Sequence, residues 1–231
     1  MNYPKIISVS AALAFTCAIS YAQTTLISPT LDNGGFESAT AKANFTTPTS
    51  STGVVPYWGS LISPNDTDSG VQVGGNVVYQ GAAGSYYKPG EGAFNLVTDY
   101  TIAMGDFFTL TYWAYDTNPT GSAATMTVTL FSQAAPGATY GYSPISTLAT
   151  RVDTLAQGNP FTEYTLTYTA LAADAGNDIG LTIANTAGGD YTAADNFTLT
   201  VQPVPEPSTY ALLFAGIGGL WSMRRFRRTS V

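Results

Sequence analysis

The stretch FFTLTYWAY, residues 107–115, decides the fold of this chain of 231 residues. Phe108, Leu110 and Tyr112 alternate with Thr109 and Thr111, and successive side chains of a strand point to opposite faces. A period of two with aromatic and β-branched residues is typical of a half-buried antiparallel strand. The stretch therefore predicts a strand with one face in a core and one threonine-rich face outside.

The same pattern recurs in TMTVTLF (125–131), TEYTLTYTA (162–170) and DNFTLTV (195–201). Weaker strand patterns lie at 71–79, 92–97, 145–155 and 179–184, and turn-rich stretches separate them. The predicted core faces are Met126, Val128 and Leu130; Tyr164, Leu166 and Tyr168; and Phe197, Leu199 and Val201. Long charged helix formers are almost absent. We therefore predict an all-β, two-sheet antiparallel β-sandwich, with a jelly roll as the topology that fits best.

The first 22 residues have the pattern of a signal peptide. Lys5 precedes an apolar run at 6–19, and Ser20-Tyr21-Ala22 places small residues where signal peptidase cleaves. The single cysteine, Cys17, lies inside this segment, where the preceding Thr16 fits a lipidation motif poorly. Cleavage after Ala22 would leave an exported chain that cannot form disulfides.

The last 28 residues form a second targeting segment. Val204-Pro205-Glu206-Pro207-Ser208 precedes an apolar run at 210–223, and Arg224, Arg225, Arg227 and Arg228 follow. The run has about 14 residues, fewer than the roughly 20 that span a bilayer comfortably, and the arginines would hold the end in the cytoplasm. A tail anchor that is never cleaved is the alternative to a sorting signal.

Residues 204–231 resemble the PEP-CTERM sorting signal of Gram-negative bacteria. The likeness is carried by Pro205-Glu206-Pro207, the apolar run and Arg224-Arg225. It implies processing by exosortase, a membrane-embedded cysteine transpeptidase, and an association with exopolysaccharide. The expected route is a precursor anchored in the inner membrane, followed by release to the cell surface, the extracellular matrix or a biofilm.

The body between the two signals, residues 23–203, is strongly acidic and long enough for one domain. It holds only three basic residues (Lys42, Lys88 and Arg151) against fourteen acidic ones, which gives a formal net charge near −11. Such a surface repels phosphate backbones, so nucleic acid is not an expected partner.

Three landmarks of the body resemble galactose-binding-like jelly rolls, the fold of many carbohydrate-binding modules. They are the opening NGGFE (33–37) with the later PYW (56–58), the central GDFFTL (105–110) and the closing DNFTL (195–199). The resemblance implies sugar binding or matrix adhesion more often than catalysis. It also implies a structural calcium ion held by Glu37 and Asp195, with Asn33 and Asn196 as weaker candidates.

Hard oxygen ligands suit calcium, and a disulfide-free domain would gain stability from such a clip. The alternative is that Glu37 is an ordinary strand residue and Asp195-Asn196 a turn. A second acidic stretch, residues 65–70, lacks the glutamate that ends a calcium-binding loop, so we expect a solvated turn there.

The sequence argues against an enzyme. The chain contains no histidine, and its exported form would contain no thiol, which removes the usual general base and the usual nucleophiles. Carboxylate pairs of the glycosidase type, Asp66 with Asp68 or Asp190 with Asp195, remain as a remote option.

Aromatic side chains could stack on the C–H face of a sugar, flanked by amide or carboxylate hydrogen bonds. The candidates for glycan contact are Trp58, Tyr86, Tyr87, Trp113 and Tyr115. Tyr86-Tyr87 follows a glycine- and alanine-rich stretch and is expected at a loop tip, where binding residues concentrate. The alternative is that these rings fill the core.

The sequence thus predicts a secreted surface or matrix protein sorted by exosortase, associated with exopolysaccharide and in non-catalytic contact with glycan. A purely structural matrix or coat protein without a specific ligand is the alternative. A row of exposed aromatic rings would favour binding, and burial of all the aromatic rings would favour the structural role.

Overall fold

The computed structural model describes residues 22–39, 42–46, 55–62, 65–73, 83–118, 120–134, 141–158, 161–188, 190–204 and 216–217. Twelve strands lie in this part of the chain. They are β1 (Thr24–Ile27), β2 (Ala43–Thr46), β3 (Trp58–Ser60), β4 (Asn65–Val73), β5 (Ala83–Tyr87), β6 (Gly92–Thr101), β7 (Phe107–Asp116), β8 (Thr125–Gln133), β9 (Ser146–Thr154), β10 (Thr162–Thr169), β11 (Asp178–Ala187) and β12 (Thr192–Gln202). The described part contains no helix with the length and apolarity needed to cross a bilayer.

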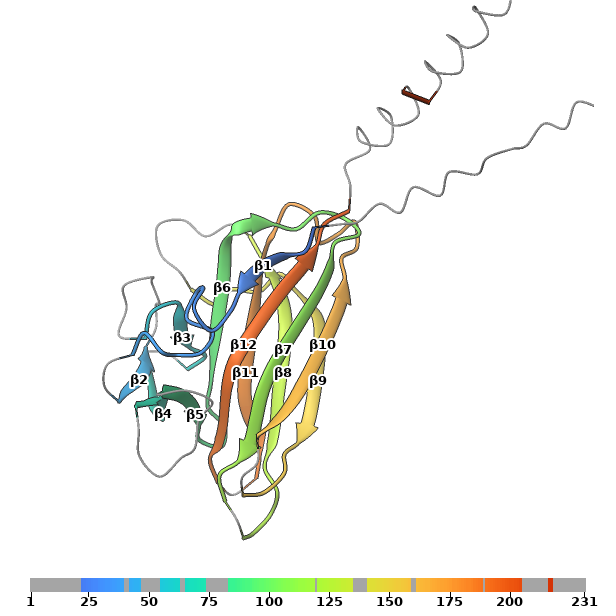
Figure 1. Cartoon of the computed structure of the whole chain (residues 1–231). Helices are drawn as coiled ribbons and strands as arrows, with labels where there is room; N and C mark the ends of the chain where they lie inside the picture. Colours follow the sequence, from blue (N-terminus) through green and yellow to red (C-terminus); the bar gives the residue numbers. More distant parts are fainter. Residues whose placement is uncertain are drawn as a thin grey trace, which may run out of the picture.

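The strands form two antiparallel sheets that pack face to face as a β-sandwich of the jelly-roll type (Figure 1). One sheet has the order β10-β7-β12-β5-β4-β2, with β1 added along the end of β12. The other has the order β3-β6-β11-β8-β9. In both sheets strands far apart in sequence are neighbours, and in the first sheet β1 lies beside β12, the last strand.

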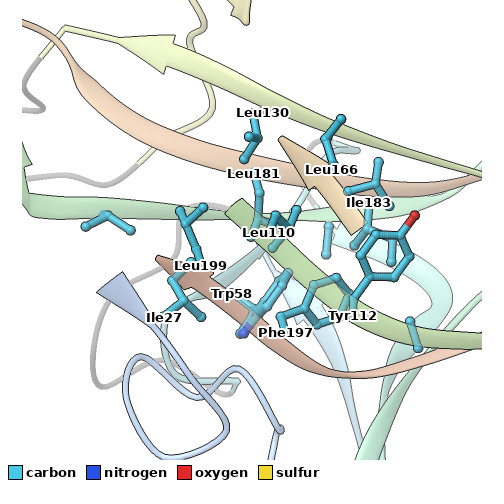
Figure 2. Close-up of a cluster of buried hydrophobic side chains, with 14 of the residues drawn as sticks. Ile27, Trp58, Leu110, Tyr112, Leu130, Leu166, Leu181, Ile183, Phe197 and Leu199 are labelled. Carbon is cyan, nitrogen blue, oxygen red and sulfur yellow. The ribbon is translucent and has the colours of Figure 1, made fainter. Parts of the chain in front are cut away.

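The core lies between the sheets and contains the residues that the period-two pattern assigned to it (Figure 2). The inward-facing apolar residues of β7, β8 and β12 are fully buried. Phe197 packs against Tyr112 with ring centroids 5.5 Å apart and against Trp58 at 5.1 Å. These large buried rings supply much of the apolar area that stabilises a domain without disulfides.

Arg151 links the two sheets along the side where β9 and β10 form their edges. Its Nε donates to Asp153 at 2.7 Å, and its Nη1 donates to the backbone carbonyl of Thr165 on β10 at 3.0 Å. Tyr112 also donates to Asp153, from within the core, at 2.8 Å. A charged side chain thus covers part of an edge that could otherwise pair with another strand.

Seven of the eight predicted strands are present, and of the one predicted at 71–79, residues 71–73 belong to β4 while residues 74–79 lie outside the described residues. Two other predictions on local structure were wrong. Residues 65–70, expected as a turn, belong to β4, and the buried Glu91 carboxylate accepts hydrogen bonds from the amides of Asp68 and Ser69. Tyr86 and Tyr87, expected at a loop tip, belong to β5 between β4 and β12. The predicted signal peptide lies outside the described residues except for Ala22, as does most of the sorting segment.

Two loops at one end of the sandwich close by the same arrangement of tyrosine and aspartate. Tyr100 donates its hydroxyl to Asp106 at 2.6 Å, and the same carboxylate oxygen accepts the amide of Ala103 at 2.7 Å. Tyr168 donates to Asp174 at 2.6 Å, and that oxygen accepts the amide of Leu171 at 2.8 Å. Burial and the hydrogen bond to Asp174 raise the pKa of Tyr168 to about 12.

We expect Tyr100→Phe and Tyr168→Phe each to lower the free energy of unfolding by about 1–2 kcal/mol, because each leaves a carboxylate without one of its donors. Chemical denaturation at neutral pH measures the loss. Tyr142→Phe is the control, since the Tyr142 hydroxyl makes no hydrogen bond with the described residues. Equal stability of all three variants would contradict the closing role of the two pairs.

Candidate functional site

The outer face of the larger sheet carries a row of aromatic residues across three neighbouring strands. Ala193 of β12 is paired with Tyr86 of β5 on one side and with Tyr115 of β7 on the other. Because directly paired residues of a sheet share a face, the two tyrosines flank the small alanine. Phe161 lies edge-on to Tyr115, with ring centroids 4.6 Å apart.

A pocket of about 210 Å³ lies beside Tyr86, near the start of β12 and the end of β7. The Tyr86 and Tyr191 rings face one another in it, with centroids 6.1 Å apart at 51°. Four polar side chains complete the lining: Lys42, Asp68, Gln72 and Thr117. An aromatic pair ringed by hydrogen-bonding groups is the composition that a sugar site requires.

One lysine lines the pocket of this otherwise acidic domain. The Lys42 ammonium lies 5.2 Å from the centre of the Tyr86 ring, within the range of a cation–π contact. Lys88 binds Asp68 at 2.9 Å. Lys42 is the basic residue of the described lining, and Lys88 reaches the pocket through its ion pair with Asp68. The carboxylates of Asp68 and Glu91, which both act on Tyr86, balance the two lysine charges.

Tyr86 remains a neutral phenol over the physiological pH range. Burial, followed by Tyr191, Asp68 and Glu91, raises the pKa of Tyr86 to about 12. The Oη atom of Tyr86 is buried and has no hydrogen-bond partner among the described residues. The ring of Tyr86, and not its enclosed hydroxyl, is therefore the part that a ligand in the pocket can contact.

The other aromatic candidates for glycan contact fall into two groups. Trp58 and Tyr87 are 1% and 0% exposed and belong to the main core, so neither offers a face to a sugar, and this part of the prediction is corrected. Tyr115 and the half-buried Trp113 lie with Phe161 on the outer face of the sheet, where Tyr115 is only 4% exposed. Tyr86 alone among the five candidates lines the pocket.

Sequence reasoning missed the remaining residues of the pocket. Lys42 precedes β2, Gln72 is in β4, and Thr117 and Tyr191 lie on loops next to β7 and β12. No spacing in the sequence connects these positions, because the sheet order brings them together. The scarcity of basic residues in the body is the sequence signal that could have pointed to Lys42.

The predicted calcium residues lie in a corner where the opening loop meets β12. The amide of Phe197 donates to the carbonyl of Gly34 at 2.9 Å. A Cβ atom on Gly34 would collide with the carbonyls of Phe197 and Ser28, so the close approach of loop and strand requires glycine here. The resemblance in sequence thus placed the opening and closing motifs together, as the structure has them.

Glu37 and Asp195 approach the same part of the sheet from two sides. Glu37 accepts the amide of Ala83 through Oε1 at 3.3 Å. Ser85, two residues further along β5, pairs with Ala194, the neighbour of Asp195. Asp195 is fully buried, and its Oδ1 accepts the amide of Asn196 at 2.7 Å. Glu37 is exposed and reaches in from the opening loop.

The backbone of this corner adopts unusual conformations. Five non-glycine residues in the described part of the chain have positive φ angles, and all belong to the opening loop, the neighbouring 56–58 segment or the bulge of β12: Asp32, Asn33, Phe36, Tyr57 and Asn196. Asn33 joins the first two segments, since it donates to Pro56 O at 3.2 Å and its own carbonyl accepts the Trp58 indole N–H at 3.0 Å. Such conformations persist only where the surroundings hold them.

The donors in this corner fit a calcium ion better than a transition metal. The described residues contain no group of three or more His, Cys, Asp or Glu side chains that could hold a metal. Glu37 and Asp195 are the two carboxylates that the predicted site would offer a cation, and neutral oxygens would have to complete its shell. Calcium accepts such mixed oxygen ligands, whereas zinc and iron sites generally need nitrogen or sulfur.

The C-terminal segment is identified by comparison with protein-family models. Residues 203–228 match the PEP-CTERM protein-sorting motif. The chain carries a PEP-CTERM sorting signal. The motif indicates an exported protein that is processed by exosortase. The comparison with curated proteins yielded no relative.

Solved structures share the fold of the body at low sequence identity. A cyclase from Fischerella sp. TAU superposes with a TM-score of 0.59 and 19% identity, over 80% of this chain and 100% of its own. A CBM22 xylan-binding domain from Paenibacillus barcinonensis Xyn10C gives a TM-score of 0.48 and 15% identity, over 80% and 99%. A further CBM22 xylan-binding domain gives 0.43 and 14%, over 75% and 99%. At these identities the likeness concerns the fold alone.

Proposed function

We propose that this protein is sorted by exosortase to the cell surface or the extracellular matrix, where it contacts exopolysaccharide without catalysis. The contact is made in the pocket beside Tyr86. The observation that carries the proposal is the facing pair of Tyr86 and Tyr191 with Lys42, Asp68, Gln72 and Thr117 around them. The rings supply apolar faces, and the polar groups bind sugar hydroxyls.

Lys42 favours a sugar that carries a carboxylate. The body as a whole repels anions, and Lys88 is already held by Asp68, so Lys42 is the cation that the pocket lining offers a ligand. A uronate carboxylate could take a charge-assisted hydrogen bond from Lys42, which is stronger than a bond between neutral groups. Acidic polysaccharides should therefore bind better than neutral ones, and added salt should reduce the difference.

We expect Lys42→Gln to weaken binding of an acidic polysaccharide about tenfold, equivalent to ~1.4 kcal/mol, while Lys42→Arg retains most of the affinity. Tyr191→Ala should weaken acidic and neutral polysaccharides alike, because it removes a ring rather than a charge. Affinity electrophoresis in gels that contain acidic or neutral polysaccharide measures both effects.

Tyr142→Ala is the matched control for the loss of a ring, since Tyr142 packs on Phe94 and Phe131 of the other sheet. If Lys42→Gln and Tyr191→Ala migrate as the unaltered protein does in every gel, the pocket is not a glycan site. Equal retardation of the unaltered protein by acidic and neutral polysaccharides would contradict the preference for acidic sugars.

A structural coat protein without a specific ligand is the second candidate, and one observation favours it. β7, β10 and β12 each carry the sequence Thr-Leu-Thr, and the threonines pair in register: Thr109 with Thr167 and Thr200, and Thr111 with Thr165 and Thr198. This ordered hydroxyl surface suits lateral contact between molecules. Absence of binding to every polysaccharide, together with self-association of the protein, would favour this role.

A further inference from the structure

Two loops meet at the end of the sandwich where β12 finishes. The β6–β7 loop spans residues 102–106, and the β10–β11 loop spans residues 170–177. The amide of Gly105 donates to Ala170 O at 2.8 Å, and the amide of Gly176 donates to Ile102 O at 2.9 Å. Val204, two residues after β12, joins them through a hydrogen bond of 3.4 Å from its amide to Asp106.

Three large apolar side chains are exposed on the two loops and on the segment that follows β12. Met104 is 63% exposed, Leu171 62% and Val204 44%. We call Met104, Leu171 and Val204 the exit tip. The other exposed residues of the two loops are small and uncharged: Ala103, Ala172, Ala173, Ala175 and Gly176. Exposed apolar groups gathered in one place mark a surface that meets a partner or a membrane.

The exit tip presents no charge to its surroundings. Asp106 and Asp174 are the only ionisable residues of the two loops, and they are 0% and 5% exposed. Their carboxylates turn inward to the hydroxyls of Tyr100 and Tyr168. In a body with a net charge near −11, this is an uncharged apolar surface built around buried acids.

β1 begins and β12 ends at this same end of the sandwich (Figure 1). Val204 is followed by five residues and then by the apolar run that starts at Tyr210. Six residue steps span at most about 20 Å, so an inserted run would keep the exit tip within that distance of the bilayer. Thr24, at the start of β1, pairs with Val201 and places the beginning of the body there too.

We propose that the exit tip rests on the surface of a phospholipid bilayer while the C-terminal segment is inserted. Met104 and Leu171 enter the boundary between headgroups and acyl chains, as apolar side chains of interfacial proteins do. Because the tip carries no cation, it favours neutral over anionic lipid. The tip and the pocket lie at opposite ends of β12, about 35 Å apart for eleven residues of strand, so the pocket faces away from the membrane.

The proposal is independent of sugar binding and is tested on the full chain in phosphatidylcholine vesicles. Cys17 is first replaced by serine. Three variants are then made, each with one new cysteine at position 104, 171 or 152, and that cysteine carries an environment-sensitive fluorophore. Val152 is the matched site, because it is 62% exposed and lies on β9, away from the tip. We expect probes at 104 and 171 to brighten and to be quenched at least threefold more by brominated lipid than the probe at 152. Equal quenching at the three sites overturns the proposal.

A second measurement places the fluorophore at position 173 and introduces negative charge at the exit tip. Met104→Glu combined with Leu171→Glu should lower quenching of this probe at least threefold, whereas Val152→Glu should leave it unchanged. Thermal unfolding shows whether the two glutamate variants are folded. If they are not, the comparison of the probes at 104, 171 and 152 in the otherwise unaltered protein provides the test. Quenching that falls equally in both variants, or that depends on protein concentration as in self-association, overturns a bilayer contact.

Discussion

Replacement of Pro205, Glu206 and Pro207 by alanine is expected to leave the whole protein as an uncleaved precursor in the inner membrane. The family comparison identifies residues 203–228 as the sorting motif, and processing requires recognition of its polar part. The apolar run at 210–223 and the four arginines after it are unchanged in this variant. They would continue to hold the end of the chain in the membrane and its charges in the cytoplasm.

Mass spectrometry and fractionation of cells that contain exosortase measure the effect. The unaltered protein should lose its C-terminal segment and leave the membrane fraction, whereas the triple variant should retain both the segment and the membrane. Ser208→Ala with Thr209→Ala is the matched control, because it changes the neighbouring spacer and leaves the motif intact. A triple variant with the same mass and fractionation as the unaltered protein would show that the motif does not direct sorting.

The sequence was sufficient to predict the long strands, because alternation over seven or more residues records burial directly. Phe108, Leu110 and Tyr112 are fully buried, as are Phe197 and Leu199. The core face of β10 was harder to read, since β10 is an edge strand. Leu166 there is buried, while Tyr164 and Tyr168 are half-buried.

The short strands could not be predicted, because three to five residues give too few alternations to set a period. Tyr86 and Tyr87 of β5 are both below 9% exposure, since this strand has β4 on one side and β12 on the other. Residues 65–70 were assigned to a turn from their polar composition. Glu91, more than twenty residues later, provides the acceptor for their amides, and that contact is invisible in the local sequence.

The candidate site was predictable only where a residue type is rare. Aromatic residues are frequent in this chain, and Trp58 is buried in the core while Tyr86 lines a pocket. Basic residues are scarce, and of the three in the body Lys42 lines that pocket while Lys88 pairs with Asp68 of its lining. In an acidic protein of this kind, the few cations would have been the better guide to the site.

We propose that calcium binds between Glu37 and Asp195 and stabilises the folded protein. The corner joins the first segment of the domain to its last strand, which are 158 positions apart in sequence, and Phe197 already bonds to Gly34 there. Calcium binding to the native state alone raises stability by RT ln(1 + [Ca²⁺]/Kd), about 2.7 kcal/mol at a hundredfold excess over Kd. A chain without disulfides has no covalent substitute for this link.

Glu37→Gln and Asp195→Asn should each remove most of that calcium-dependent gain, because each substitutes a neutral amide for a carboxylate ligand. Thermal unfolding in millimolar calcium and in chelator measures the gain as a difference between two midpoints. Glu163→Gln is the control of equal charge change, since Glu163 is exposed on β10, and it should keep the full difference. Asp195→Asn is also expected to lower stability in chelator, because Asp195 is fully buried. The deciding quantity is therefore the difference between the midpoints with calcium and with chelator, not either midpoint alone. If calcium and chelator give the unaltered protein the same midpoint, Glu37 and Asp195 are ordinary structural residues of the corner and hold no ion.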